Sequence, residues 1–174
     1  MNTLPSSRSA KRIPQLALRF GALPDGAVSW CDGCGIVYLG REITVRLSTH
    51  QGGAELDGDE LHLPLPPEAS GRQVQDSAEA WLRQQCLTYV DEVLGQLQSR
   101  QLVLVARRYP QILLSFAARS PWVAVEDANT LRCNWRLIEQ TPQVLLQHAE
   151  KALREIDALQ NANATADMFG ATFN

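Results

Sequence analysis

Residues 122–158, WVAVEDANTLRCNWRLIEQTPQVLLQHAEKALREIDA, decide the fold of the second half of the chain. Two apolar segments, residues 122–125 and 131–135, flank Asp-Ala-Asn and predict a β-hairpin. Thr141 and Pro142 then begin a helix, because threonine is a good N-cap and proline suits the first helical position. Helical spacing also predicts the face that this helix buries. The predicted inward stripe consists of Leu145, His148, Ala149, Ala152, Leu153 and Ile156.

The residues before this stretch predict a sheet, a long helix and two short strands. Period-two alternation and turn signals indicate a sheet with four strands. The expected strands are residues 36–39, 43–47, 54–56 and 61–65. Residues 77–98 have apolar positions at helical spacing, and residues 102–105 and 112–114 are expected to be buried strands. The predicted class is therefore α+β: an antiparallel N-terminal sheet, a long helix, a small second sheet and a packed C-terminal helix.

The length of 174 residues suits one domain with a substantial core. Residues 1–30 are expected to form a flexible basic leader, since no acidic residue precedes Asp25. Residues 31–160 are expected to form the single domain. Residues 161–174 show little periodicity and are expected to form an irregular tail.

Composition narrows the classes of function and location. The net charge of -3 gives no general argument for binding nucleic acid or an acidic membrane. No apolar run approaches the roughly 20 residues that span a bilayer, so no membrane is expected. The four cysteines are expected to be free thiols in a reducing compartment, because no credible export signal precedes them. A cytoplasmic protein is the expectation.

Three motifs occur in a fixed order: Trp122, then Asn134-Trp135-Arg136-Leu137, then Leu153-Arg154-Glu155. In order and spacing they resemble the zinc-peptidase-like YgjP family, where Trp-Gly-Ser-Cys and Asn-Trp-Arg-Leu precede a helix carrying HExxHLRE. Residues 40–47 and 57–66 also resemble the strands of that family. The resemblance covers about residues 36–160. It implies a minimal zincin-like fold of the gluzincin-like metallopeptidases.

The same resemblance implies that the metal site is degenerate. His148 matches the first metal histidine of the family, whereas Ala149 stands at the general base and Ala152 at the second histidine. The third histidine falls near Ala158, and the Gly-Ser-Cys segment is replaced by residues 123–125. Because a catalytic zinc needs three protein ligands and an open position, the resemblance implies a pseudoenzyme with no cofactor.

The leading hypothesis is therefore a catalytically inactive metallopeptidase-like domain that acts as a protein-binding or scaffold module. Its partner would be another protein or a second copy of the chain. The candidate binding residues are Trp122, Trp135, Arg136, His148, Arg107 and Arg108.

Two alternatives remain open. A metal-dependent hydrolase would use a non-standard zinc site, with Cys31, Cys34 and a histidine as ligands. His148 is a further weak candidate for a metal ligand. A nucleic-acid-binding module would instead combine the arginines near the second sheet with stacking on Trp122 and Trp135.

Overall fold

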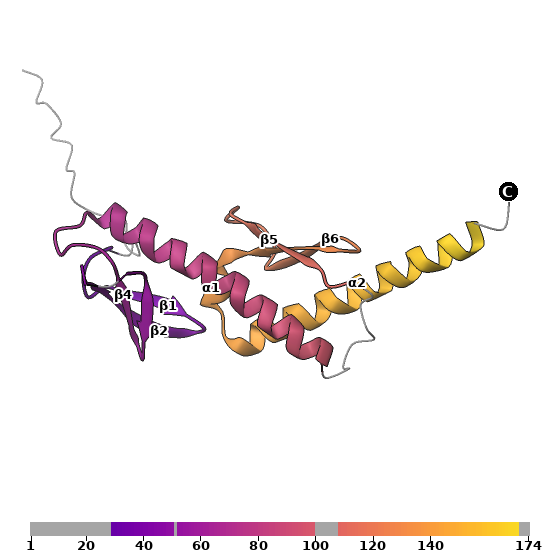
Figure 1. Cartoon of the computed structure of the whole chain (residues 1–174), viewed down its shortest axis with the longest axis horizontal. Coiled ribbons are helices and arrows are strands. Elements are labelled where there is room, and N and C mark those ends of the chain that lie inside the picture. The colour runs from indigo at the N-terminus through magenta and orange to yellow at the C-terminus, as the bar shows by residue number, and fades with distance from the viewer. Residues whose placement is uncertain (1–28, 51, 100–107, 171–174) are drawn as a thin grey trace, which may run out of the picture.

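The computed structural model describes residues 29–50, 52–99 and 108–170 of the chain, with side chains described up to residue 165. Two small sheets and two long helices confirm the α+β class (Figure 1). The leader residues 1–28 and the predicted strand at residues 102–105 lie outside the described residues. The elements are β1 (Gly35–Tyr38), β2 (Arg41–Leu47), β3 (Glu55–Asp57), β4 (Glu60–Leu63), α1 (Gly71–Ser99), β5 (Gln111–Ser115), β6 (Val123–Asp127), β7 (Thr130–Asn134), the 3-10 helix η1 (Trp135–Glu139) and α2 (Pro142–Gly170).

The first sheet contains the four predicted strands, but its order is β1-β2-β4-β3 and β2 pairs with β4 in parallel. The prediction of a purely antiparallel N-terminal sheet was therefore wrong for this pair. The reason is the strand order: the chain crosses from β2 to the edge strand β3 and returns through the antiparallel β3–β4 hairpin, so β4 lies beside β2 in the same direction. The short and mostly exposed β3 takes the edge, where unpaired backbone groups can meet water.

Helix α1 begins at Gly71 rather than at residue 77, and a capping box explains the earlier start. The Gln73 side chain accepts hydrogen bonds from the Ser70 backbone N–H at 2.9 Å and from its hydroxyl at 2.8 Å. The Gln73 N–H donates in return to Ser70 Oγ at 3.4 Å. Serine followed three residues later by glutamine is a sequence signal for a helix start, so the first turn of α1 was predictable.

The second sheet has the order β5-β7-β6. The predicted hairpin is confirmed as β6 and β7, and its turn is stabilised by the Asn129 N–H, which donates to Asp127 Oδ1 at 2.7 Å. Strand β5 runs parallel to β7, so Gln111 pairs with Thr130 and Ser115 pairs with Asn134. The two ends of this sheet are consequently formed by different parts of the chain.

Helix α2 begins at Pro142 as predicted and continues to Gly170. The prediction of an irregular tail was wrong for residues 161–170, which are helical. Residues 171–174 lie outside the described residues. Alanine alternates with polar residues here and favours a helix. The polar side chains bond locally: Asn161 donates to Asp157 at 3.3 Å, and Thr165 donates to the Asn161 carbonyl at 2.8 Å. Figure 1 shows this part of α2 extending beyond both sheets.

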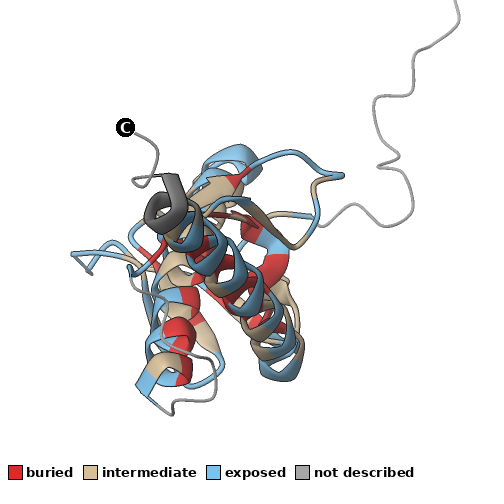
Figure 2. Cartoon of the chain, turned by 90° about the vertical axis from the view of Figure 1, so that its right-hand side faces the viewer, coloured by how far each residue is buried: buried red, intermediate tan, exposed pale blue. Residues whose placement is uncertain are grey.

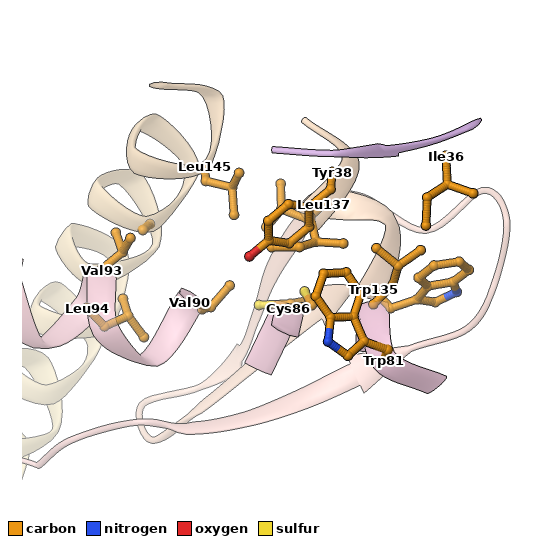
Figure 3. Close-up of a cluster of buried hydrophobic side chains, with 14 of the residues drawn as sticks. Ile36, Tyr38, Trp81, Cys86, Val90, Val93, Leu94, Trp135, Leu137 and Leu145 are labelled. Atoms are coloured by element: carbon orange, nitrogen blue, oxygen red, sulfur yellow. The ribbon is translucent and has the colours of Figure 1, made fainter. Parts of the chain in front are cut away.

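One hydrophobic core connects both sheets and both helices. Buried residues lie on the faces that the helices turn toward the rest of the domain (Figure 2). The close-up in Figure 3 places Tyr38, Cys86 and Trp135, from three different elements, in one cluster. Helix η1 is joined directly to the first sheet. The Leu39 N–H, just after β1, donates to the Ile138 carbonyl of η1 at 2.8 Å.

Asn134, at the junction of β7 and η1, uses both halves of its buried amide. The residue is only 3% exposed. Its Nδ2 donates to Ser120 Oγ at 3.0 Å, to the Ser120 carbonyl at 3.3 Å and to the Ala117 carbonyl at 3.4 Å. Its Oδ1 accepts the Arg136 N–H at 3.1 Å, which caps η1. The side chain therefore ties the loop after β5 to the start of η1.

We expect Asn134→Asp to lower the free energy of unfolding by about 2–4 kcal/mol, measured by urea denaturation at pH 7. A carboxylate has the same shape but donates no hydrogen bond, so the oxygen that replaces Nδ2 would face the Ala117 and Ser120 carbonyls. The control is Asn163→Asp on an exposed turn of α2, which should change stability by less than about 0.5 kcal/mol. Equal effects of the two variants would contradict the role of the Asn134 amide.

Candidate functional site

The face of α2 where the implied metal motif should lie is part of the hydrophobic core. Ala149 is 6% exposed and Ala152 is 4% exposed. Ala149 lines an apolar cavity of about 10 Å³ together with Val123 and Cys133. This volume is about the minimum for a single water molecule, and a water also needs polar partners that this lining does not provide. The arrangement leaves no room for a metal-bound water and a substrate.

His148 lies at the edge of the buried stripe of α2 and is half-buried. Among the described residues, its side chain has no hydrogen bond or ion pair, and no three His, Cys, Asp or Glu residues are grouped to hold a metal. The neighbouring Glu150 is directed to Arg154, with Oε2 at 3.7 Å from Nη2. The donors around His148 thus do not fit a catalytic zinc, which takes three protein ligands.

Strand β6 supplies the residues that replace the Gly-Ser-Cys segment. Val123, Ala124 and Val125 are half-buried, and α2 packs directly on this strand. Trp122, which precedes β6, also packs against the core, and its carbonyl accepts the Asn134 N–H at 2.9 Å. The segment therefore contributes apolar packing and backbone hydrogen bonds to the helix–sheet contact.

Cys31 and Cys34 lie in a turn before β1, on the first sheet. Cys31 is exposed and Cys34 is half-buried. In the described part of the chain, neither His50 nor His62 joins them in a group of three potential ligands. The hydrolase alternative, which requires a histidine beside this pair, gains no support from the geometry.

Of the two arginines predicted to bind near the second sheet, only Arg108 is described, and it does not lie with Trp135. Arg107 lies outside the described residues. Arg108 is exposed at the end of the sheet that contains the β6–β7 turn, where Gln160 donates to the Arg108 carbonyl at 3.2 Å and to the Ala128 carbonyl at 2.7 Å. Arg132 is paired with Glu126, which reduces the positive charge available for the nucleic-acid hypothesis.

Trp135 and Arg136 are brought together in an open pocket of about 230 Å³ at the other end of the second sheet. We call it the Trp135 pocket. It is formed by α1, by the loop after β5 and by the β7–η1 junction. Its lining residues are Glu79, Arg83, Phe116, Ala117, Ala118, Asn134, Trp135 and Arg136.

Two guanidinium groups lie over the Trp135 ring. Arg83 Cζ is 5.2 Å from the ring centroid and Arg136 Cζ is 4.9 Å from it. Arg83 also lies 5.6 Å from the Phe116 centroid, so it is held between two aromatic rings. Such contacts contribute about 0.5–2 kcal/mol each, depending on exposure. Trp135 therefore fixes the positions of both cations.

Polar groups of the pocket are incompletely matched within the domain. Glu79 pairs with Arg83, and Arg136 Nη1 lies 3.4 Å from Glu139 Oε1. Nε of Arg83 is nevertheless buried without a hydrogen-bond partner in the described residues. Phe116 at the rim is 66% exposed. The pocket thus combines an exposed aromatic ring with two arginines and one buried donor that has no partner in the described residues.

Arg83, Glu79 and Phe116 were not among the sequence candidates. Glu79 and Arg83 stand at i and i+4 on α1. From the sequence alone, this spacing indicates an ordinary helical ion pair and gives no sign of a pocket. Phe116 falls between two predicted elements and belongs to no periodic pattern. The packing of α1 against η1 places Glu79 and Arg83 beside Trp135, and the loop after β5, held by Asn134, brings Phe116 to the same pocket.

The domain is a small α+β unit in which one long helix joins two sheets and a second helix packs on the second sheet. A family model described as "YgjP-like, metallopeptidase domain" matches residues 20–146. The chain belongs to this YgjP-like metallopeptidase family. The match includes Trp122 and the Asn134–Leu137 motif and ends before His148. Searches of curated proteins and of solved structures found no significant match.

Glu139 gives the pocket a pH dependence. Burial raises the pKa of the Glu139 carboxyl, and the nearby Glu79 raises it further. Arg136 lowers this pKa, but the net direction is upward. A carboxyl whose pKa is raised on folding contributes stability below its unfolded pKa, and loses it as pH rises through the folded pKa. We therefore expect the stability gained by Glu139→Gln over the wild type to be larger at pH 7 than at pH 4.

Urea unfolding at the two pH values tests this. Glu155→Gln, an exposed carboxylate on α2, is the control and should show no such difference. A Glu139→Gln difference that is the same at both pH values would contradict the argument.

Ala149→Glu tests whether the general base of the family can be restored. The new carboxylate would be buried among apolar residues, so we expect a loss of about 3 kcal/mol or more in the free energy of unfolding. Gln147→Glu places the same charge on an exposed position of the same helix and should cost less than about 0.5 kcal/mol. A folded, equally stable Ala149→Glu protein would show that the core is not closed at this position.

Proposed function

We propose that this chain is a catalytically inactive metallopeptidase-like domain that binds a protein partner through the Trp135 pocket. The observation that carries the first part is the burial of Ala149 and Ala152 in an apolar core. Side chains that would activate water are absent from the helix face, and neighbouring apolar groups fill the space they would need. A reducing, cytoplasmic location is part of the proposal, since all four cysteines are free thiols.

The second part rests on the character of the Trp135 pocket. Binding sites between proteins commonly contain aromatic residues and arginine at their centre. Here Phe116 is exposed, Trp135 is fixed under two arginines, and Arg83 Nε lacks a partner in the described residues. An acidic or flat side chain of a partner would accept hydrogen bonds from Arg83 and Arg136 while it covers Phe116.

Inactivity is tested by comparing the wild type with His148→Ala. We expect both proteins to have the same metal content by elemental analysis and the same rate in a peptide-hydrolysis assay, no greater than the buffer rate. Gln147→Ala, an exposed neighbour on α2, is the matched control. Peptide hydrolysis and bound zinc that both disappear in His148→Ala would overturn the proposal of inactivity.

Partner binding is tested with a photo-crosslinking amino acid placed at Phe116 in cells. We expect a discrete crosslinked product at Phe116 that decreases at least about fivefold when Arg136→Ala is added, the loss expected for a central interface residue. Tyr109 is the matched control, because it is also an exposed aromatic but hydrogen-bonds to Asp91, away from the pocket. Equal products at both positions, or a product insensitive to Arg136→Ala, would contradict this surface as the binding site.

A further inference from the structure

The turn that carries Cys31 and Cys34 lies outside the Trp135 pocket, and the half-buried Cys34 packs against the edge of the core. The turn is anchored on β2, because the Gly33 N–H donates to the Val45 carbonyl and the Val45 N–H to the Cys34 carbonyl, both at 2.8 Å. Asp32 Oδ1 also accepts the Leu47 N–H at 3.0 Å. The backbone of this exposed turn is therefore fixed by three hydrogen bonds to one strand.

The same turn begins at Cys31 and ends at Cys34. The Cys34 N–H donates to the Cys31 carbonyl at 3.1 Å, which closes a four-residue turn. Gly33 has a φ of +78°, a conformation that side chains disfavour. The Cα atoms of the two cysteines are therefore less than about 7 Å apart.

The surroundings of this Cys-x-x-Cys pair differ from those of a redox pair. Reactive pairs lie at a helix N-terminus, where the pKa of the attacking thiol is lowered. Here the pair precedes strand β1, and burial raises the pKa of Cys34. Thiols held at two-residue spacing in a turn are instead a common half of a structural zinc site, which uses four ligands.

The described residues do not supply the other half. Among them, no third His, Cys, Asp or Glu stands near enough to form a metal-binding group. The residues whose side chains are not described contain no His or Cys, and their acidic residues are Asp25 and Asp167. Because Cys86 and Cys133 are buried in the core, further sulfur ligands for this turn must come from another molecule.

We propose that Cys31 and Cys34 of two copies of this chain bind one zinc ion between them. Four thiols lose their protons as four zinc–sulfur bonds form, so the site carries a charge of -2 and releases four protons. The side-chain-free Gly33 and the exposed Cys31 allow two turns to approach each other. Arg46 Nη1 lies 3.9 Å from the position of a β-carbon on Gly33, and its guanidinium is paired with Glu60. This site does not depend on the function of the Trp135 pocket.

The experiment measures zinc content and mass of the full chain, purified with zinc and a non-metal-binding reductant. We expect half an equivalent of zinc per chain by elemental analysis and a dimer by native mass spectrometry. Cys31→Ser and Cys34→Ser should each lose at least about tenfold in zinc affinity and give monomers. Cys86→Ala changes a buried thiol outside the turn and should keep both properties. Circular dichroism checks that every variant is folded.

Three results would overturn the proposal: no bound zinc, one zinc per monomer, or a dimer that survives removal of zinc by a chelator. Zinc lost on His148→Ala but retained in Cys31→Ser would instead overturn the proposed inactivity together with this site. Zinc lost only in the two cysteine variants supports this site and leaves the inactivity proposal standing. The outcomes therefore separate the two proposals.

Discussion

The hydrogen bonds of Asn134 are the constraint on which the rest of the structure depends. This buried amide holds the loop after β5 and caps η1. Helix η1 in turn packs on α1 and accepts the Leu39 N–H from the first sheet. The first sheet and α1 therefore contact a short segment that continues β7 and leads into α2, and one side chain caps the start of this segment. Buried amides have this influence because an unsatisfied donor or acceptor in the core is costly.

The same junction determines where chemistry can occur. On α2, Ala149 and Ala152 stand where the family resemblance implies metal-site residues, and both face the core. Their small side chains let the helix pack closely on β6. On the opposite side of η1, Trp135 and Arg136 lie beside an open pocket. The face of α2 to which the resemblance assigns the metal motif is thus closed and apolar. The Trp135 pocket is open and combines charged and aromatic residues. The proposed change from enzyme to binding module follows from this exchange.

Local signals predicted most of the secondary structure but not how strands associate. The spacing of Leu61 and Leu63 indicated a strand, yet only the crossing of the chain to the edge strand β3 decided that β4 enters the sheet in parallel with β2. The prediction of an irregular tail at the end of α2 was wrong for another reason. Residues 161–170 lack an apolar stripe, and the helix there is maintained by alanine propensity and local side-chain bonds. The candidate site was half predicted, since Trp135 and Arg136 stood out in the sequence whereas Arg83 and Phe116 did not.

By itself, the sequence determined the α+β class, the β6–β7 hairpin, the start of α2 and the family, because these rest on local periodicity and ordered motifs. It also determined that Ala149 and Ala152 cannot bind a metal, since alanine has no donor atom. Only the tertiary structure decided that both alanines are buried, and that Arg83 from α1 lies between Trp135 and Phe116. The physical reason is that burial and stacking depend on contacts between residues far apart in the chain, which no local pattern specifies.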